Sequence, residues 1–130
     1  WLQNGKLHRD DGPAVIYANG GQEWWQNGKR HRDDGPASMY AEGTQFWYQN
    51  GERHRDGGPA AIFTGGEQEW WRNGERHRDD GPAVICADGL KMWYLDGKFI
   101  KLTRENISRV KSARHFFRKV KLKTISLNKN

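Results

Sequence analysis

Short apolar stretches alternate with polar stretches along the chain, and the alternation repeats every 23 residues. Each copy holds an apolar stretch after Gly-Pro-Ala, a glycine-containing turn, a second apolar stretch and a polar segment. Sequence periods of about 20 to 50 residues are typical of stacked repeat proteins. The pattern therefore predicts a repeat array in place of a single globular core. One tryptophan marks the period in each copy: Trp1, Trp24, Trp47, Trp70 and Trp93.

Within one copy, residues 12–34, the pattern predicts two strands, over residues 14–18 and 22–26. Asn19-Gly20 separates them, and this dipeptide is favoured in two-residue type I′ turns because both positions need a positive φ. Asn27-Gly28 predicts a second tight turn. Each copy is therefore expected to be a β-hairpin followed by a polar loop that leads into the next copy.

A two-residue turn at Asn19-Gly20 would set the pairing of the two strands. Val15 would lie opposite Trp24, so that Val15, Tyr17 and Trp24 share one face of the sheet. We expect this face to be the packed one. Equivalent residues of stacked hairpins lie two strand spacings apart, about 10 Å. The five tryptophans are therefore expected to form a ladder along an elongated, twisted sheet.

The polar loop carries the sequence His-Arg-Asp in every copy. The three rows are His8, His31, His54 and His77; Arg9, Arg32, Arg55 and Arg78; and Asp10, Asp33, Asp56 and Asp79. We expect these side chains to form a structural ladder in which charged groups pair within and between loops. The positive charges of the Arg row and the negative charges of the Asp row largely cancel. Binding of a polyanion in a groove along the array is therefore a weaker interpretation.

Other chemistries of these loops are disfavoured. A metal ion needs ligand nitrogens at about 2.0–2.1 Å, whereas histidines of neighbouring copies would lie about 10 Å apart. A kinase-type catalytic loop needs an asparagine five residues after its aspartate, and Ser38 stands at that place after Asp33. We therefore expect no metal, no cofactor and no catalysis.

The positive charge of the chain lies almost entirely after the repeats. Residues 1–97 contain 11 Lys/Arg and 15 Asp/Glu, a net charge of −4, whereas residues 98–130 contain 11 Lys/Arg and one acid, a net charge of +10. A partner that is attracted by positive charge is therefore expected to bind residues 98–130 alone.

The 23-residue period ends at Gly97. Thr103 is suited to a helix N-cap, and apolar residues then recur at three- and four-residue spacing, which predicts an amphipathic helix over residues 104–119. Such a helix would cap the last repeat. Its basic residues are candidates for binding an anionic partner: Arg104, Arg109, Lys111, Arg114, Arg118, Lys119, Lys121 and Lys123.

The sequence resembles MORN-type repeats, whose unit is also a 23-residue β-hairpin. The similarity lies in the segment Trp-Gln-Asn-Gly-Lys-Arg-His at residues 25–31, followed by Ala-Asn-Gly or Ala-Asp-Gly in the hairpin turns, and it covers about residues 1–97. Two elements differ: Arg-Asp-Asp-Gly-Pro-Ala stands after the histidine in place of Gly-x-Gly, and the glycine of the family's Tyr-x-Gly element is missing. The chain therefore resembles a divergent, bacterial- or virus-like variant. The resemblance implies a scaffold or interaction role without catalysis.

These observations predict an all-β array of stacked antiparallel hairpins, four to five repeats over residues 1–97, with a basic helical segment over residues 98–130. The expected function is that of a structural or protein–protein interaction module, with a protein partner or a second copy bound. Two alternatives remain open: nucleic-acid or anionic-membrane binding through residues 104–123, and sequestration of a small ligand in a Trp-lined cleft. The only cysteine, Cys86, excludes an intrachain disulfide. We expect an intracellular location, either the cytoplasm or a virus particle or infected cell.

Overall fold

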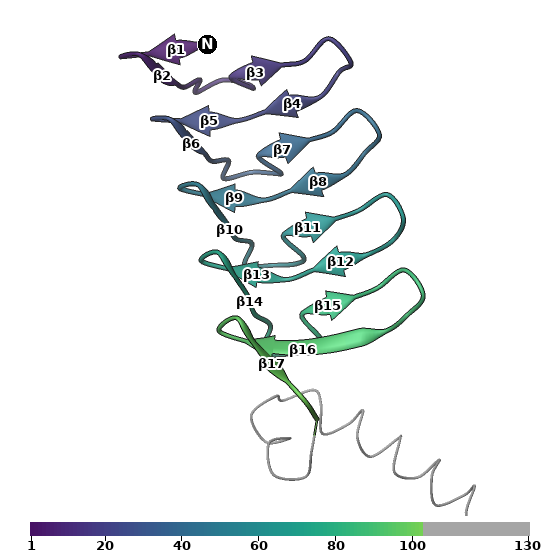
Figure 1. The fold of residues 1–130 in the computed structure, drawn as a ribbon. Coiled ribbons are helices and arrows are strands. Elements are labelled where there is room, and N and C mark those ends of the chain that lie inside the picture. Colours follow the sequence, from purple (N-terminus) through teal and green to yellow (C-terminus); the bar gives the residue numbers. More distant parts are fainter. Residues whose placement is uncertain (103–130) are drawn as a thin grey trace, which may run out of the picture.

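Each 23-residue copy folds into two linked hairpins, and the copies stack side by side in sequence order (Figure 1). The computed structural model describes residues 1–102. Strands β1 to β8 are Leu2–Gln3, Lys6–Leu7, Val15–Ile16, Gln22–Glu23, Trp25–Gln26, Lys29–Arg30, Ser38–Met39 and Gln45–Phe46. Strands β9 to β17 are Tyr48–Gln49, Glu52–Arg53, Ala61–Ile62, Gln68–Glu69, Trp71–Arg72, Glu75–Arg76, Val84–Ile85, Lys91–Leu95 and Lys98–Ile100.

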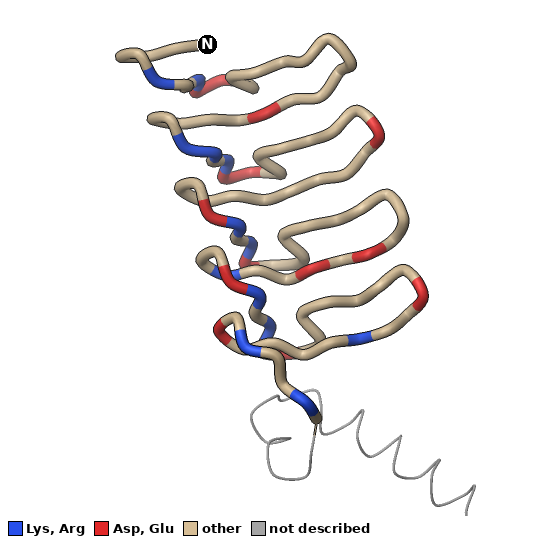
Figure 2. The backbone as a smooth tube through the Cα atoms, viewed as in Figure 1, with Lys and Arg blue, Asp and Glu red and all other residues tan. Residues whose placement is uncertain are grey.

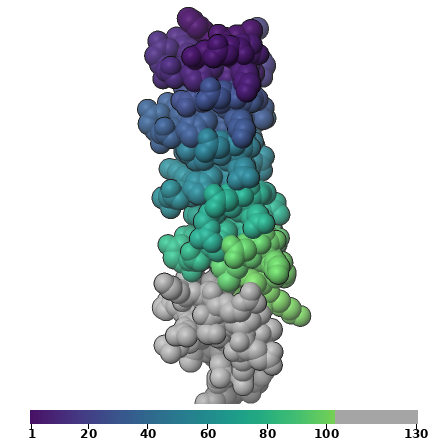
Figure 3. Space-filling view, turned by 90° about the vertical axis from the view of Figure 1, so that its left-hand side faces the viewer, coloured from purple at the N-terminus to yellow at the C-terminus, as the bar shows by residue number. Residues whose placement is uncertain are grey.

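Nine strands form one continuous antiparallel sheet, in the order β17-β16-β15-β12-β11-β8-β7-β4-β3. Four small hairpins, β1-β2, β5-β6, β9-β10 and β13-β14, stand beside it. The space-filling view shows the copies as successive layers (Figure 3). Residues 1–102 therefore form the antiparallel hairpin array that the period predicts.

The first turn of each hairpin differs from the prediction. The Tyr17 amide donates to the Gly21 carbonyl at 2.8 Å, and the Gly20 amide donates to the Tyr17 carbonyl at 3.0 Å. Gly20 has a φ of 95°, whereas Asn19 is not among the residues with positive φ. This is a three-residue loop with a glycine bulge, and the Asn19 side chain accepts from the Gly21 amide at 3.0 Å. The predicted two-residue turn is wrong because Gly20 alone takes the left-handed conformation.

The longer turn shifts the strand pairing by one residue. Val15 lies opposite Glu23 and Ile16 opposite Gln22, so the predicted pairing of Val15 with Trp24 is also wrong. The face that contains Val15 is the packed one along most of the sheet. Its cross-strand row consists of Val15, Glu23, Ser38, Phe46, Ala61, Glu69, Val84 and Met92. All members are buried except the half-buried residues at its two ends.

The second turn agrees with the prediction. Asn27 and Gly28 have φ values of 50° and 76°, and Trp25 pairs with Arg30 across a two-residue turn. The predicted return strand over residues 22–26 is interrupted at Trp24, whose amide donates to the Ala37 carbonyl of the next copy at 2.7 Å. This bond joins successive copies at the place where the main sheet gives way to the small hairpin.

The end of the described chain has its own small core. Trp93 and Ile100 are buried together, and Leu95 and Leu102 pack against them. The sheet continues through β17, which lies in the segment that the sequence assigns to the basic region. The predicted helix over residues 104–119 and its basic residues lie outside the described residues. Within residues 1–102, no helix is long and apolar enough to cross a membrane.

Candidate functional site

The four His-Arg-Asp loops follow β2, β6, β10 and β14 and line up along one side of the array, here called the loop edge (Figure 2). The loop edge comprises residues 8–13, 31–36, 54–59 and 77–82. Each loop runs from the end of a small hairpin to the first strand of the next copy. The stacking of the copies therefore places equivalent charged residues in successive positions along one side of the molecule.

The histidines connect each loop to the following copy. The Nε2 atom of each ring lies 2.8–2.9 Å from the first aspartate of its own loop. The Nδ1 atom accepts a backbone N–H from the turn of the next copy, at 3.0 Å from Asn27 to His8 and at 2.9 Å from Asp96 to His77. Because Nδ1 accepts, the proton resides on Nε2, and that nitrogen donates to the carboxylate. Each imidazole therefore joins its own loop to the turn of the next copy.

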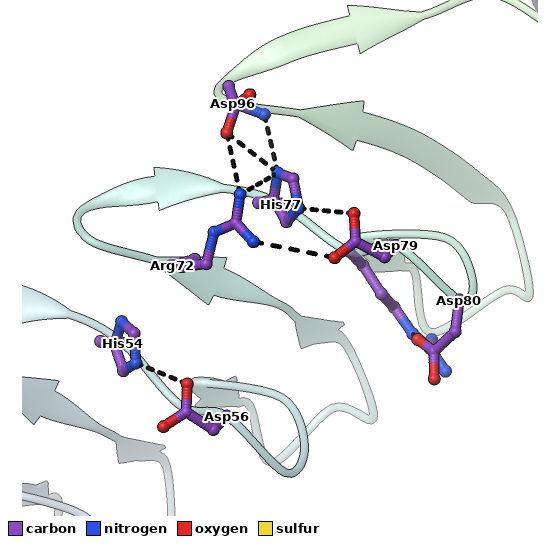
Figure 4. A network of polar contacts seen from close by, with 8 residues as sticks. His54, Asp56, Arg72, His77, Asp79, Asp80 and Asp96 are labelled. Carbon is purple, nitrogen blue, oxygen red and sulfur yellow. Dashed lines mark hydrogen bonds and ion pairs between the residues drawn. The ribbon is translucent and has the colours of Figure 1, made fainter. Parts of the chain in front are cut away.

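The last of these connections is reinforced by charge (Figure 4). His77 is buried, and the Nη2 atom of Arg72 lies 3.5 Å from its Nδ1 atom. Arg72 donates to Asp96 at 3.1 Å and lies 3.7 Å from Asp79. Gln26 and Gln49 occupy the place of Arg72 in earlier copies. The final junction of the array therefore gains an ion-pair network that the earlier ones lack.

The arginines of the loops cover the tryptophan row. The guanidinium carbon lies 3.9–4.2 Å from a ring centroid in the pairs Arg9–Trp1, Arg32–Trp24, Arg55–Trp47 and Arg78–Trp70. The Nη1 atom donates to the proline carbonyl of the same loop at 3.1–3.3 Å. The Nε atom donates to the second aspartate in three loops, at 2.8–3.0 Å, and Gly57 replaces that aspartate in the other loop. Each guanidinium is therefore engaged by its own loop.

The outward charge of the loop edge is consequently negative. The side chains of Arg9, Arg32 and Arg78 are only 22–24% exposed. The aspartate side chains of the four loops are 65–91% exposed. The hydrogen bond from Arg9, followed by its positive charge, lowers the pKa of Asp11. The aspartates thus lie at the surface, while the arginines that balance their charge lie beneath.

Three similar open grooves lie between successive loops. Their volumes are about 670, 690 and 680 Å³ in chain order. A tryptophan of the ladder lines each groove: Trp24, Trp47 and Trp70. Aspartates of two consecutive loops also line each groove. The structure therefore repeats one surface three times, with carboxylates on both sides and a tryptophan on which the arginine of the loop is stacked.

A second row of repeated contacts, among arginines, aromatic rings and buried glutamates, lies at the packed face. The sequence pattern did not reveal this row. Arg30 lies between the rings of Trp25 and Tyr48, with its guanidinium carbon 4.9 and 5.6 Å from their centroids. The buried Glu23 accepts from the Trp25 indole and from Arg30, both at 2.9 Å.

Glu69, Trp71 and Arg76 repeat this arrangement two copies later. Between them, Phe46 and Tyr48 stand in the places of Glu23 and Trp25. The sequence signal for this device is therefore an alternation with a period of 46 residues.

Residues 1–102 contain no group of three or more His, Cys, Asp or Glu side chains arranged to hold a metal ion. No known protein-family model matches the sequence, and no curated protein is detectably similar to it.

Proposed function

We propose that this chain is a non-enzymatic scaffold, of a divergent MORN-like type, that binds basic protein segments along its loop edge. The observation that carries the proposal is the opposite orientation of the charges in the loops. Every loop arginine is held against a tryptophan, whereas the aspartates face solvent. Ordered carboxylates at regular spacing favour a partner with regularly spaced Lys or Arg.

The grooves support a protein partner over a small ligand. Each is open and wide, whereas small-molecule sites enclose most of their ligand. The exposed carboxylates on both sides of each groove suit the charged end of a Lys or Arg side chain, whose aliphatic stem can lie along the groove wall. Repetition of the same surface in three places favours an elongated partner that contacts several copies at once.

The test uses fluorescein-labelled deca-lysine and the full-length chain. Binding is measured by fluorescence anisotropy for the chain and for D11N/D34N/D80N, which neutralises the second aspartate of three loops. These positions are suitable because one loop already has Gly57 there. Three exposed ion pairs at about 0.2–1 kcal/mol each predict roughly tenfold weaker binding.

The matched control is E42Q/E52Q/D88N, which removes three exposed acids away from the loop edge and should change the affinity less than twofold. Equal weakening by both variants would show that net charge alone attracts the peptide and would refute the proposal. Binding of single-stranded DNA or anionic vesicles, without binding of deca-lysine, would instead favour a function carried by residues 104–123.

A further inference from the structure

We infer that the loop edge of one molecule binds residues 104–118 of a second copy of this chain. The inference rests on the proposed function and names its partner. The surface consists of the three grooves, each lined by a tryptophan and by the aspartates of two loops. The occupant is the basic segment that follows the array, and two arguments connect it to the grooves.

The spacing of the grooves matches the spacing of three cations in the segment. Equivalent points of neighbouring copies lie about 10 Å apart, because each copy adds two strands to the sheet. Arg104, Lys111 and Arg118 are spaced seven residues apart. In the helix that the sequence predicts, seven residues rise about 10.5 Å and complete nearly two turns. Three cations on one side of such a helix would therefore match three grooves.

The charges of the grooves and of the segment are also complementary. The aspartates of the loops are the outward groups of the grooves, and residues 98–130 carry a net charge of +10 against −4 for residues 1–97. Within the predicted helix, the positions of Arg104, Lys111 and Arg118 fall on the side opposite Ala113 and Phe116, with Ile107 among the cations. One side of the helix would then supply cations to the grooves, while the other keeps its apolar residues for packing.

A second copy is favoured over the same molecule by chain length. Arg104 follows Leu102, the last described residue, by only two positions, which span at most about 7 Å. The described chain ends beside β17, at the far end of the array from β1 (Figure 1). So short a connection leaves little chain in which to reverse direction and lay the segment back along its own loops. Another molecule can present the segment without that reversal.

The test combines sedimentation with zero-length cross-linking of the full-length chain. Sedimentation velocity compares the wild type with R104E/K111E/R118E, which should raise the dimer dissociation constant at least tenfold. The matched control, R109E/R114E/K119E, changes the net charge equally but reverses positions five residues apart, which lie on different sides of a helix. It should weaken the dimer less than threefold.

Carbodiimide cross-linking of mixed ¹⁴N- and ¹⁵N-labelled chains locates the contact. The middle cation must lie in the middle groove whichever way the helix runs, so the expected product joins Lys111 to Asp33, Asp34 or Asp56 and contains both isotopes. Products of one isotope only would show binding within one molecule and would overturn the inference. A monomeric wild type, or equal effects of the two variants, would also overturn it. The proposed function would still stand if deca-lysine binds the loop edge.

Discussion

Two adjacent glycines in the third loop, residues 54–59, provide a sensitive test of the stacking of Arg55 on Trp47. A Cβ on Gly58 would lie 3.1 Å from the Arg55 guanidinium carbon, closer than ordinary van der Waals contact, whereas a Cβ on Gly57 would meet nothing within 4 Å. Neither glycine has a positive φ, so alanine can adopt both backbone conformations. The substitutions G57A and G58A therefore differ mainly in whether the side chain displaces Arg55.

The expected magnitudes follow from the contacts of Arg55. Alanine at either position stabilises the fold by about 0.5 kcal/mol by restricting the unfolded chain. In G58A, displacement of Arg55 weakens its hydrogen bond to the Pro59 carbonyl, worth about 1 kcal/mol. It also weakens the stacking on Trp47, worth about 0.5–1 kcal/mol. G58A should therefore be less stable than G57A by roughly 1.5 kcal/mol.

Thermal unfolding of the full-length chain, followed by circular dichroism, measures this difference. At about 4–8 °C per kcal/mol for a domain of this size, G58A should melt roughly 6–12 °C below G57A. The substitution G81A repeats the test more severely, because its Cβ would lie 2.5 Å from the Arg78 guanidinium carbon. If G58A proves as stable as G57A, the guanidinium is not held in place and the argument for inward-facing arginines fails.

Four further predictions concern the contact between copies, the packed face and the titration of two glutamates. H54A removes hydrogen bonds to its own loop and to the next copy, and should lower the free energy of unfolding by about 2 kcal/mol in urea titrations. E69F should cost about 2–4 kcal/mol, since it leaves an indole and a guanidinium without their acceptor; E69F/W71Y, which copies the neighbouring repeat, should recover much of this loss. Burial, together with a neighbouring carboxylate, raises the pKa of Glu67, so E67Q should raise the melting temperature at pH 7, with the gain vanishing below pH 4.5. A hydrogen bond from Thr44 lowers the pKa of Glu42, so E42Q should lower the melting temperature at pH 7, with the loss fading as the pH falls below 4.5.

Control variants separate these effects from general damage. D56N keeps an oxygen acceptor for His54 at a side chain that is 91% exposed, and it should cost less than about 0.5 kcal/mol. If D56N destabilises the fold as much as H54A, the bond between copies is not the important one. If E69F/W71Y is no more stable than E69F, the alternation on the packed face has no energetic basis.

The sequence predicted the hairpin array but assigned one of its two turns wrongly, and the copies themselves contained the missing information. The first residue of the 27–28 turn and its equivalents is always Asn or Asp, residues that tolerate a positive φ. At the position of Asn19 the copies have Asn, Glu, Gly and Asp. Glutamate at this position argues against a left-handed conformation, so comparison across copies favours the three-residue turn.

The loop edge was only partly predictable for a different reason. The rows of His, Arg and Asp follow directly from the period, and a structural role was expected for them. The period does not show which side chains these His, Arg and Asp residues contact in the folded protein. Arg32 reaches a tryptophan eight residues earlier, and the Nδ1 atom of His31 accepts from Asn50 of the next copy at 3.0 Å. Such contacts depend on the depth and direction of side chains in three dimensions. The outward orientation of the aspartates could likewise be known only once the arginines had been placed.

The alternation on the packed face constrains how such an array can change in length. The large Phe46 ring lies between Ser38 and Ala61, two small residues that leave room for it. Glu23 and Glu69 instead depend on indole and guanidinium donors. Insertion or loss of a single 23-residue copy would place two units of the same kind side by side and mismatch these volumes. Adding or removing two copies would keep the alternation of acidic and apolar units along this row, so we expect such an array to change in length more readily in steps of 46 residues.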